Sequence, residues 1–343
     1  MENGNSMGTA TQHSAASIEM PGGYLKIDPL PNFRYRVTAV PESPQVFIAR
    51  ESCETDFSLA LIQAVVAEST IGWICDLIAR HCEPDYVSQA LKHQLDAFRP
   101  PGEMRGEILD FGCGSGASTI FMARMFPHAQ VTGVELRENA VELATRIAQG
   151  TGVTNARFLL SPSGESLPAG IGPFDGIMLS AVYEHLLPSE RLTLLPLLWS
   201  ALKPGGILYI NQTPHRWSPL EHHTTGLWFI NYLPDGLARY LANNYAREAP
   251  EENRQRDWEQ LLRAGIRGGT EPEILSNIRQ TPGARPVVLQ PRQGDRAAHW
   301  LAATNPGRMR TAKKAIAGLF RMTDRLFGVV PATQVEMAIR KDA

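Results

Sequence analysis

The sequence predicts an α/β protein with a doubly wound, mostly parallel sheet, an N-terminal helical segment and a helical cap inserted after the fifth strand. Three observations support this fold class. From Glu107 onward, short apolar runs alternate with helical patterns, as in a parallel sheet covered on both faces. A glycine-rich stretch, GCGSG at residues 112–116, joins the first run to a helix. Residues 212–284 then interrupt the alternation with many aromatic and histidine side chains.

The N-terminal third of the chain carries helical patterns and no glycine-rich motif. Residues 1–30 are predicted as a disordered tail and residues 31–104 as a helical segment. A helical apolar pattern over 55–80 begins with Thr55 and Asp56, which are typical N-cap residues. A second helix is predicted over 83–98, where Pro84 suits the first turn.

Residues 105–211 are predicted as the core of the fold. Helices are expected at 116–126, 138–150 and 189–202, with Gly150 ending the second. Strands are expected at 107–111, 129–136, 156–161, 174–180 and 206–211. In an open sheet of this kind, the ligand binds at the carboxyl ends of the strands.

The remainder of the chain is divided into an insertion and a segment that returns to the sheet. Residues 212–284 are predicted as a cap that contacts the substrate, since long insertions in such folds commonly carry function. Residues 285–343 are predicted to complete the sheet, with strands at 285–290 and 334–341.

Composition narrows the function classes. The 343 residues carry a formal net charge of −2, which gives no general attraction to nucleic acid. The most apolar stretch, residues 58–79, is interrupted by Glu68 and Asp76, which argues against a membrane span. The first residues lack the basic and apolar regions of a signal peptide. A cytoplasmic protein is therefore expected.

The glycine-rich stretch predicts a nucleotide-like ligand. Gly112, Gly114 and Ala117 fit a dinucleotide-binding fingerprint, although that match is weak by itself. Asp110 favours a ligand with a positive group, because a carboxylate close to a pyrophosphate adds repulsion. Glu135 ends the second strand, where a carboxylate can accept hydrogen bonds from ribose hydroxyls in either kind of ligand.

Three further motifs accompany the acidic residue and GxGxG pattern of residues 110–116. They are the Glu135 strand end, PFDGIMLSAVYEHL at 173–186 and LKPGGILYI at 202–210. In this order, the motifs resemble the class I S-adenosylmethionine-dependent methyltransferases, particularly the ubiquinone-biosynthesis-like small-molecule branch. The resemblance covers about residues 105–211 and implies a Rossmann-like sheet and S-adenosylmethionine as cofactor.

The resemblance also implies which residues contact the cofactor. The glycine loop would approach the methionine part, Glu135 the ribose and Leu136 the adenine. Ser163 stands where the family usually has an aspartate that binds the adenine amino group. The predicted cofactor-binding residues are Asp110, Gly112, Cys113, Gly114, Gly116, Glu135, Leu136, Ser163, Gly164 and Ser180.

Histidines are the candidate catalytic residues. His185 follows the fourth strand and is expected to face the reactive end of the cofactor, either as a general base or as a residue that orients the loop. Glu184 beside it is predicted as a helix-start or loop contact rather than as the base. His222 and His223 are predicted to contact the substrate, act as a base or have structural roles. Because adjacent residues point in different directions, no metal site is predicted around them.

The predicted function is methyl transfer to a small-molecule acceptor, most simply at a hydroxyl oxygen. A nucleic-acid methyltransferase, an NAD(P)-dependent oxidoreductase and a non-catalytic S-adenosylmethionine-binding protein are the alternatives. No N-P-P-[YF] motif follows the fourth strand, so no nucleic-acid partner is predicted.

One segment raises the question of a membrane partner. Residues 308–327 form a basic amphipathic pattern, which is typical either of an interfacial helix or of a helix packed on its own domain. Peripheral membrane contact would favour a lipid-linked or apolar acceptor. The oligomeric state is not specified by the sequence.

Overall fold

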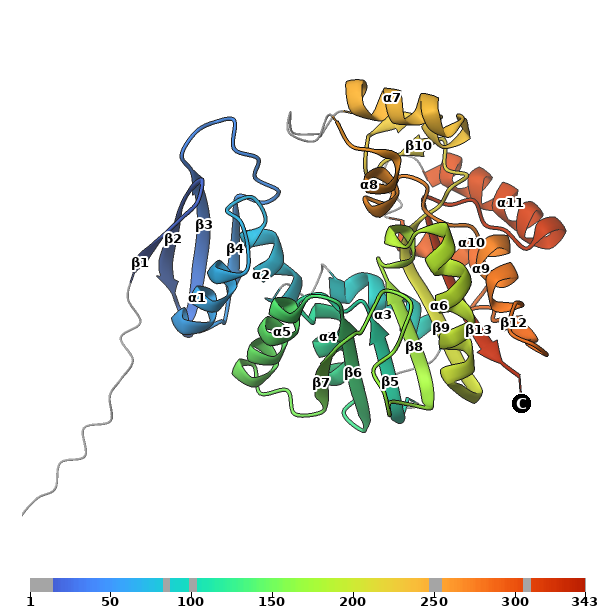
Figure 1. Cartoon of the computed structure of the whole chain (residues 1–343), viewed down its shortest axis with the longest axis horizontal. Coiled ribbons are helices and arrows are strands. Elements are labelled where there is room, and N and C mark those ends of the chain that lie inside the picture. The colour runs from blue at the N-terminus through green and yellow to red at the C-terminus, as the bar shows by residue number, and fades with distance from the viewer. Residues whose placement is uncertain (1–14, 83–86, 99–103, 247–254, 305–309, 343) are drawn as a thin grey trace, which may run out of the picture. The chain divides into compact units, whose positions relative to one another are not determined.

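The computed structural model describes residues 15–82, 87–98, 104–246, 255–304 and 310–342 (Figure 1). The chain forms two compact units, residues 1–84 and 85–343.

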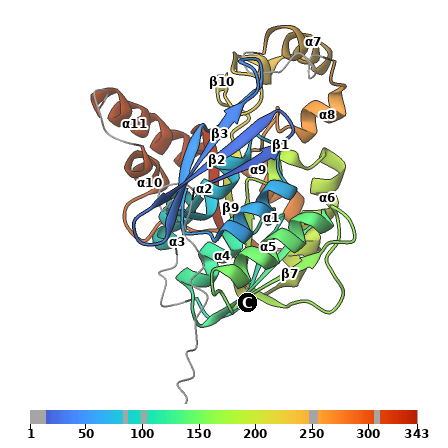
Figure 2. The same ribbon diagram turned by 90° about the vertical axis from the view of Figure 1, so that its left-hand side faces the viewer.

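The first unit contains a four-stranded antiparallel sheet in the order β1-β2-β3-β4, whose first three strands are seen side by side in Figure 2. Side chains along β2 and β3 alternate between buried and exposed, as expected for a sheet with one covered face. Two helices follow the strands. The elements are β1 (Ala16–Met20), β2 (Gly23–Leu30), β3 (Arg34–Pro41), β4 (Ser52–Thr55), α1 (Leu59–Ala67) and α2 (Ile74–Cys82).

This sheet contradicts the prediction of a disordered tail over 1–30 followed by a helical segment over 31–104. Strands occupy 16–55, and residues 1–14 lie outside the described part. A period-two pattern buries Leu25 and Ile27, and a tight turn at Gly22 and Gly23 pairs β1 with β2. Charged residues between the apolar ones concealed this pattern.

The helix predicted over 55–80 is two helices. Ser58 caps α1 by accepting from the backbone N–H of Leu61, whereas Thr55 belongs to β4. The chain turns between the helices at Gly72, where a Cβ would lie 2.6 Å from the carbonyl oxygen of Phe47. Pro84, predicted to start the next helix, lies outside the described residues.

The second unit is built on a seven-stranded sheet in the order β12-β13-β9-β8-β5-β6-β7. Pairing is parallel from β9 to β7, and β13 runs antiparallel to both β9 and β12. This arrangement confirms the predicted doubly wound, mostly parallel fold class. The strands are β5 (Gly106–Phe111), β6 (Ala129–Glu135), β7 (Ala156–Leu160), β8 (Phe174–Ser180), β9 (Leu202–Pro214), β12 (Pro286–Val288) and β13 (Gln334–Lys341).

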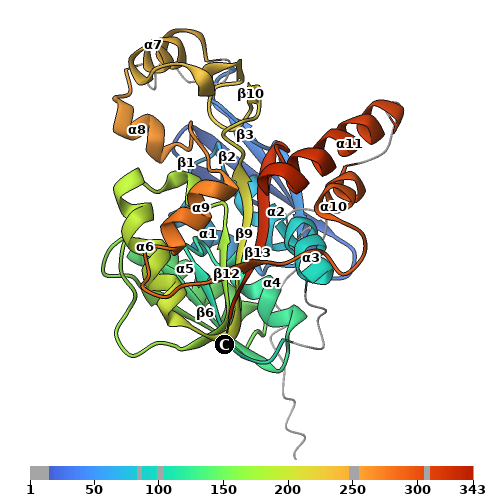
Figure 3. The ribbon, with the colours of Figure 1, turned by 90° about the vertical axis from the view of Figure 1, so that its right-hand side faces the viewer.

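Helices cover both faces of this sheet. One apolar core lies under α3 (Val87–Phe98) and α4 (Ala117–Met125), and another lies under α6 (Pro188–Ala201) and α9 (Glu271–Ile278). Figure 3 shows α6 and α9 on one side of β9 and β13, with α3 on the other. α3 is fixed to the sheet by the Gln94 side-chain amide, which donates to the carbonyl oxygens of Ile210 and Met337. α5 (Glu138–Gly150) includes Gly150, and Thr151 caps it.

The insertion after β9 forms a small layer with its own core of Ile230, Ala238, Ala242, Leu261 and Ile266. Its boundaries differ from the predicted 212–284. Residues 212–214 continue β9, and α9 packs against the core sheet rather than within the cap. The cap elements are β10 (Leu220–Glu221), β11 (Leu227–Trp228), η3 (Ile230–Tyr232), α7 (Asp235–Tyr245) and α8 (Trp258–Arg263).

The C-terminal segment returns to the sheet through α10 (Arg296–Ala303), α11 (Arg310–Phe327) and β13. α11 packs on α10 through Phe320, whose ring lies 4.8 Å from that of Trp300. Its remaining large apolar side chains, Ile316, Leu319, Met322, Leu326 and Phe327, are exposed. Within the described residues, every helix is too short or too polar to cross a bilayer.

Candidate functional site

The site lies where the order of the parallel strands reverses. From β5 the chain passes to β6 and β7 on one side, whereas β8 and β9 lie on the other side of β5. In open α/β sheets, ligands bind at the carboxyl ends of the strands at such a reversal. The glycine loop follows β5 and the turn η2 (Tyr183–His185) follows β8. The two segments meet, since a Cβ on Gly112 would lie 2.7 Å from Cγ2 of Val182.

Gly114 and Gly116 suit their positions in the loop for different physical reasons. Both have positive φ, 54° at Gly114 and 87° at Gly116. A Cβ at Gly116 would lie 2.8 Å from the Phe158 ring and 2.9 Å from Cβ of Ala144, so this glycine permits close packing. A Cβ at Gly114 would meet no heavy atom of the described chain within 4 Å. Gly114 therefore leaves the loop backbone open to a ligand.

Asp110 lies under the loop and is only 1% exposed. One of its carboxylate oxygens accepts hydrogen bonds from Ser118 Oγ at 2.5 Å and Thr119 Oγ1 at 2.6 Å. Burial raises the pKa of Asp110 to about 6. The carboxylate thus ties the start of α4 to the loop, and little of its surface is open to a ligand. Cys113 is also buried, and burial raises the pKa of its thiol well above the usual value.

Glu135 stands at the carboxyl end of β6 and contacts the same loop. The backbone N–H of Gly114 donates to Glu135 Oε2 at 3.0 Å, and that of Arg137 donates to Oε1 at 3.2 Å. The next residue, Leu136, is 53% exposed. A Cβ on Gly164 would lie 3.9 Å from Leu136 Cδ1, so these two predicted cofactor-binding residues are neighbours.

The two predicted serines are already engaged within the chain. Ser163 Oγ lies 2.8 Å from Ser166 Oγ and accepts from the backbone N–H of Glu165. Ser180 Oγ lies 3.5 Å from the Oδ1 atom of Asn211 in the adjacent strand β9. The amide nitrogen of Asn211 is buried without a hydrogen-bond partner among the described residues. The sequence analysis did not single out Asn211, although this residue ends the strand predicted at 206–211.

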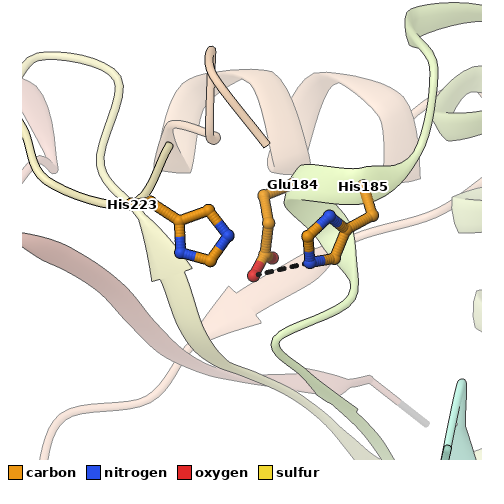
Figure 4. Close-up of side chains that lie close together, drawn as sticks. All are labelled: Glu184, His185 and His223. Atoms are coloured by element: carbon orange, nitrogen blue, oxygen red, sulfur yellow. Dashed lines mark ion pairs between the residues drawn. The ribbon is translucent and has the colours of Figure 1, made fainter. Parts of the chain in front are cut away.

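Glu184, His185 and His223 converge beside the carboxyl end of β8, as Figure 4 shows. One potential ligand atom from each lies within 4.8 Å of the other two. Glu184 is fully buried, and burial raises its pKa. Its Oε2 accepts from Thr213 Oγ1 at 3.1 Å, while Oε1 has no hydrogen-bond partner among the described residues. His185 Nδ1 lies 2.7 Å from the Arg263 carbonyl oxygen in the cap.

The structure separates the histidines that the sequence could not distinguish. His185 and His223 come together, with ring centroids 5.5 Å apart, whereas the exposed His222 supplies no atom to the cluster. Glu184, predicted only as a helix-start or loop contact, is the buried member of the cluster.

His215 belongs to a different, structural network. Its Nε2 lies 3.0 Å from Glu271 Oε2, and Arg296 pairs with the other oxygen of Glu271 at 2.7 Å. All three residues are buried. Glu221 accepts from the backbone N–H groups of residues 223–225, which shapes the turn that presents His223.

Comparison with known proteins identifies the central part of this unit. Residues 108–206 match the family model described as "Methyltransferase domain". The demethylmenaquinone methyltransferase of Lactococcus lactis is 30% identical over 152 residues, covering 44% of this chain and 57% of that protein. The trans-aconitate 2-methyltransferase of Variovorax paradoxus is 34% identical over 122 residues, covering 35% and 44%. The release factor glutamine methyltransferase of Geobacter sulfurreducens is 36% identical over 121 residues, covering 34% and 39%.

These relatives agree on methyl transfer and differ in the acceptor that each is named for. The matched segments span less than two thirds of each relative's own length.

Proposed function

We propose that this chain, whose residues 108–206 form a class I S-adenosylmethionine-dependent methyltransferase domain, methylates a hydroxyl oxygen of a small molecule. The observation that carries the proposal is the Glu184, His185 and His223 cluster, which lies after the carboxyl end of β8, where Val182 approaches the glycine loop. A hydroxyl must lose its proton as it is methylated, and imidazole and carboxylate groups are suited to that task.

The residues around the loop fit the cofactor. Gly114 leaves open space over the loop, Glu135 presents a carboxylate at the end of β6, and Leu136 offers an exposed apolar surface next to Gly164. When bound, S-adenosylmethionine supplies a methyl group already activated by a positive sulfur. The protein's contribution is then largely to orient the acceptor and to handle its proton.

His185 is proposed to take that proton. Because a carbonyl oxygen only accepts hydrogen bonds, the Nδ1 atom facing Arg263 carries the hydrogen. The lone pair of the neutral ring is then on Nε2, which lies 3.7 Å from Glu184 Oε1 and faces the cluster. His222, exposed next to His223, is proposed as a contact for the acceptor rather than as a base.

The acceptor is proposed to be apolar or lipid-linked, with peripheral membrane contact through residues 308–327. Support comes from α11, whose exposed Leu319, Leu326 and Phe327 lie on the face opposite Lys314 and Arg321. Residues 308 and 309 lie outside the described part. Co-sedimentation with anionic vesicles is expected to fall as salt rises, because headgroup attraction is screened. Phe327→Ser should weaken sedimentation, and an equal result for that variant and the native chain would contradict the proposal.

The test of methyl transfer uses labelled S-adenosylmethionine with a cell metabolite extract, followed by mass spectrometry of the labelled product. A small product that resists mild acid and base, as an ether does, would support the assignment. The Glu135→Ala variant serves as the control with impaired cofactor binding. Label found only in protein or nucleic acid would contradict a small-molecule acceptor, and tight NADH binding would contradict the donor.

A further inference from the structure

The cluster of Glu184, His185 and His223 brings together three potential electron-pair donors. Glu184 Oε1 is buried without a hydrogen-bond partner among the described residues. His185 Nε2 is the unprotonated nitrogen of its ring, since Nδ1 donates to Arg263. The 3.7 Å between Nε2 and Oε1 is too long for a hydrogen bond even if the ring were protonated.

A buried carboxylate oxygen without a donor is destabilising, so a missing positive partner is the simplest explanation of this arrangement. The exposed His223 places one potential ligand nitrogen within 4.8 Å of the other two potential ligand atoms. The unprotonated nitrogen of a neutral imidazole offers the third lone pair.

The atoms that surround the cluster hold two of its members in place. The Arg263 carbonyl fixes the tautomer and orientation of His185, and Thr213 Oγ1 occupies the second oxygen of Glu184. Metal-binding histidines and carboxylates usually have such partners on the atoms that do not face the metal. The cluster also has a route for entry, because the side chain of His185 is 42% exposed above the buried Glu184.

We propose that Glu184, His185 and His223 bind one divalent transition-metal ion of the zinc class. Two imidazoles and one carboxylate suit Zn²⁺ and its first-row neighbours, whereas Mg²⁺ and Ca²⁺ prefer oxygen ligands. At metal–ligand distances of about 2.0–2.1 Å, tetrahedral ligand atoms stand about 3.4 Å apart, close to the 3.7 Å between His185 and Glu184. Small side-chain rotations would complete the set.

Three protein ligands leave a coordination position open for water or for an acceptor oxygen, as in catalytic zinc sites. With the ion bound, His185 Nε2 would be a ligand and no longer a base, and the metal would instead make a bound oxygen lose its proton more readily near neutral pH. This catalytic role rests on the proposed function, but metal binding by the cluster does not. The site was not predicted from the sequence, because His223 is distant in the chain from Glu184 and His185.

The test measures metal binding by the full chain without any methyl donor. Protein stripped with a chelator is titrated with Zn²⁺ against a chromophoric competitor, and with Co²⁺ while its visible absorption bands are recorded. One equivalent is expected to bind, with Co²⁺ bands typical of four or five nitrogen and oxygen ligands.

Glu184→Gln and His223→Ala should each weaken Zn²⁺ binding by at least about 100-fold. Replacing a residue that only orients a ligand typically weakens metal binding by about 10–100-fold, and removing a ligand itself should weaken it at least as much. His222→Ala is the matched control, because it removes the adjacent histidine without touching the cluster. His223→Ala alters a side chain that reaches the surface, so its fold should be retained even if Glu184→Gln misfolds.

Absence of stoichiometric Zn²⁺ binding would overturn the proposal. So would equal affinities for His223→Ala and His222→Ala. If Zn²⁺ binds as expected but no methyl transfer is found, the proposed function fails while the metal site stands.

Discussion

Replacing Asp110 with asparagine should make the protein more stable at neutral pH. The native pKa of about 6 exceeds the usual 3.8 because the carboxyl is buried. Between these pH values the folded chain holds a proton that the unfolded chain has released. The stability that this proton contributes is complete below pH 3.8 and is lost as pH rises through 6. The difference between the two pKa values corresponds to about 3 kcal/mol.

Asparagine retains an oxygen that can accept from Ser118 and Thr119 but does not ionise. The free energy of unfolding of Asp110→Asn, minus that of the native chain, should therefore grow by about 2.4 kcal/mol between pH 4 and pH 7. Urea unfolding followed by hydrogen exchange of the β5 amides reports on the second unit alone. A difference that stays constant with pH, or falls, would refute the reasoning.

Asp175→Asn is the matched control for this experiment. The Asp175 carboxylate accepts from the backbone N–H of Glu107 and from Lys203 Nζ near the opposite end of β5. Removing this pairing should lower stability slightly rather than raise it. Asp110→Asn should also bind S-adenosylmethionine more weakly, because the loop loses the negative charge that attracts the cofactor's cationic groups. If Asp110→Asn is more stable but binds S-adenosylmethionine more weakly, the aspartate serves cofactor binding at the expense of stability.

Three further results are expected. Glu135→Ala should weaken S-adenosylmethionine binding about tenfold or more, since hydrogen bonds to a charged group contribute about 1.5–3 kcal/mol, and unchanged affinity in calorimetry would remove Glu135 from the site. Gly116→Ala should lower the melting temperature more than Gly114→Ala, because only Gly116 is closely packed. Gly114→Ala should instead weaken cofactor binding more than Gly116→Ala. The reverse ranking would contradict the roles given to these two glycines. Arg296→Met should destabilise the fold by about 3–5 kcal/mol in urea unfolding, since Glu271 keeps a buried charge with one partner fewer, and a loss below 1 kcal/mol would argue against a buried ion pair.

The core of the fold was predictable because its sequence signals are local. Each strand from β5 to β8 is a short apolar run next to a turn or helix signal, and the observed bounds differ from the predicted ones by one residue or none. The N-terminal sheet was missed because Lys26 and Asp28 interrupt the apolar residues of β2. Only the pairing with β1 and β3 shows that these charges lie on its exposed side.

One side of the candidate site was predictable from the sequence and the other was not. The cofactor side was predictable because the residues of its motif lie close together in the sequence between β5 and the start of α4. Asp110 shows the limit of that prediction, since Ser118 and Thr119 in the first turn of α4 donate to its carboxylate, which is buried under the loop. The acceptor side depends on a cap whose fold has no motif, so nothing in the sequence pairs His223 with Glu184.

Arg263 in the cap contacts both the start of α6 and the candidate metal site. The guanidinium of Arg263 pairs with both carboxylate oxygens of Glu190 at the start of α6, while its backbone carbonyl accepts from His185. Two residues later, a Cβ on Gly265 would lie 2.7 Å from the ring of His223. The Arg263 side chain is 43% exposed, so its ion pair contributes little to stability. Arg263 matters for the geometry of the cluster. Any shift of α8 relative to α6 would move both the Arg263 carbonyl that orients His185 and Gly265, which packs against the ring of His223.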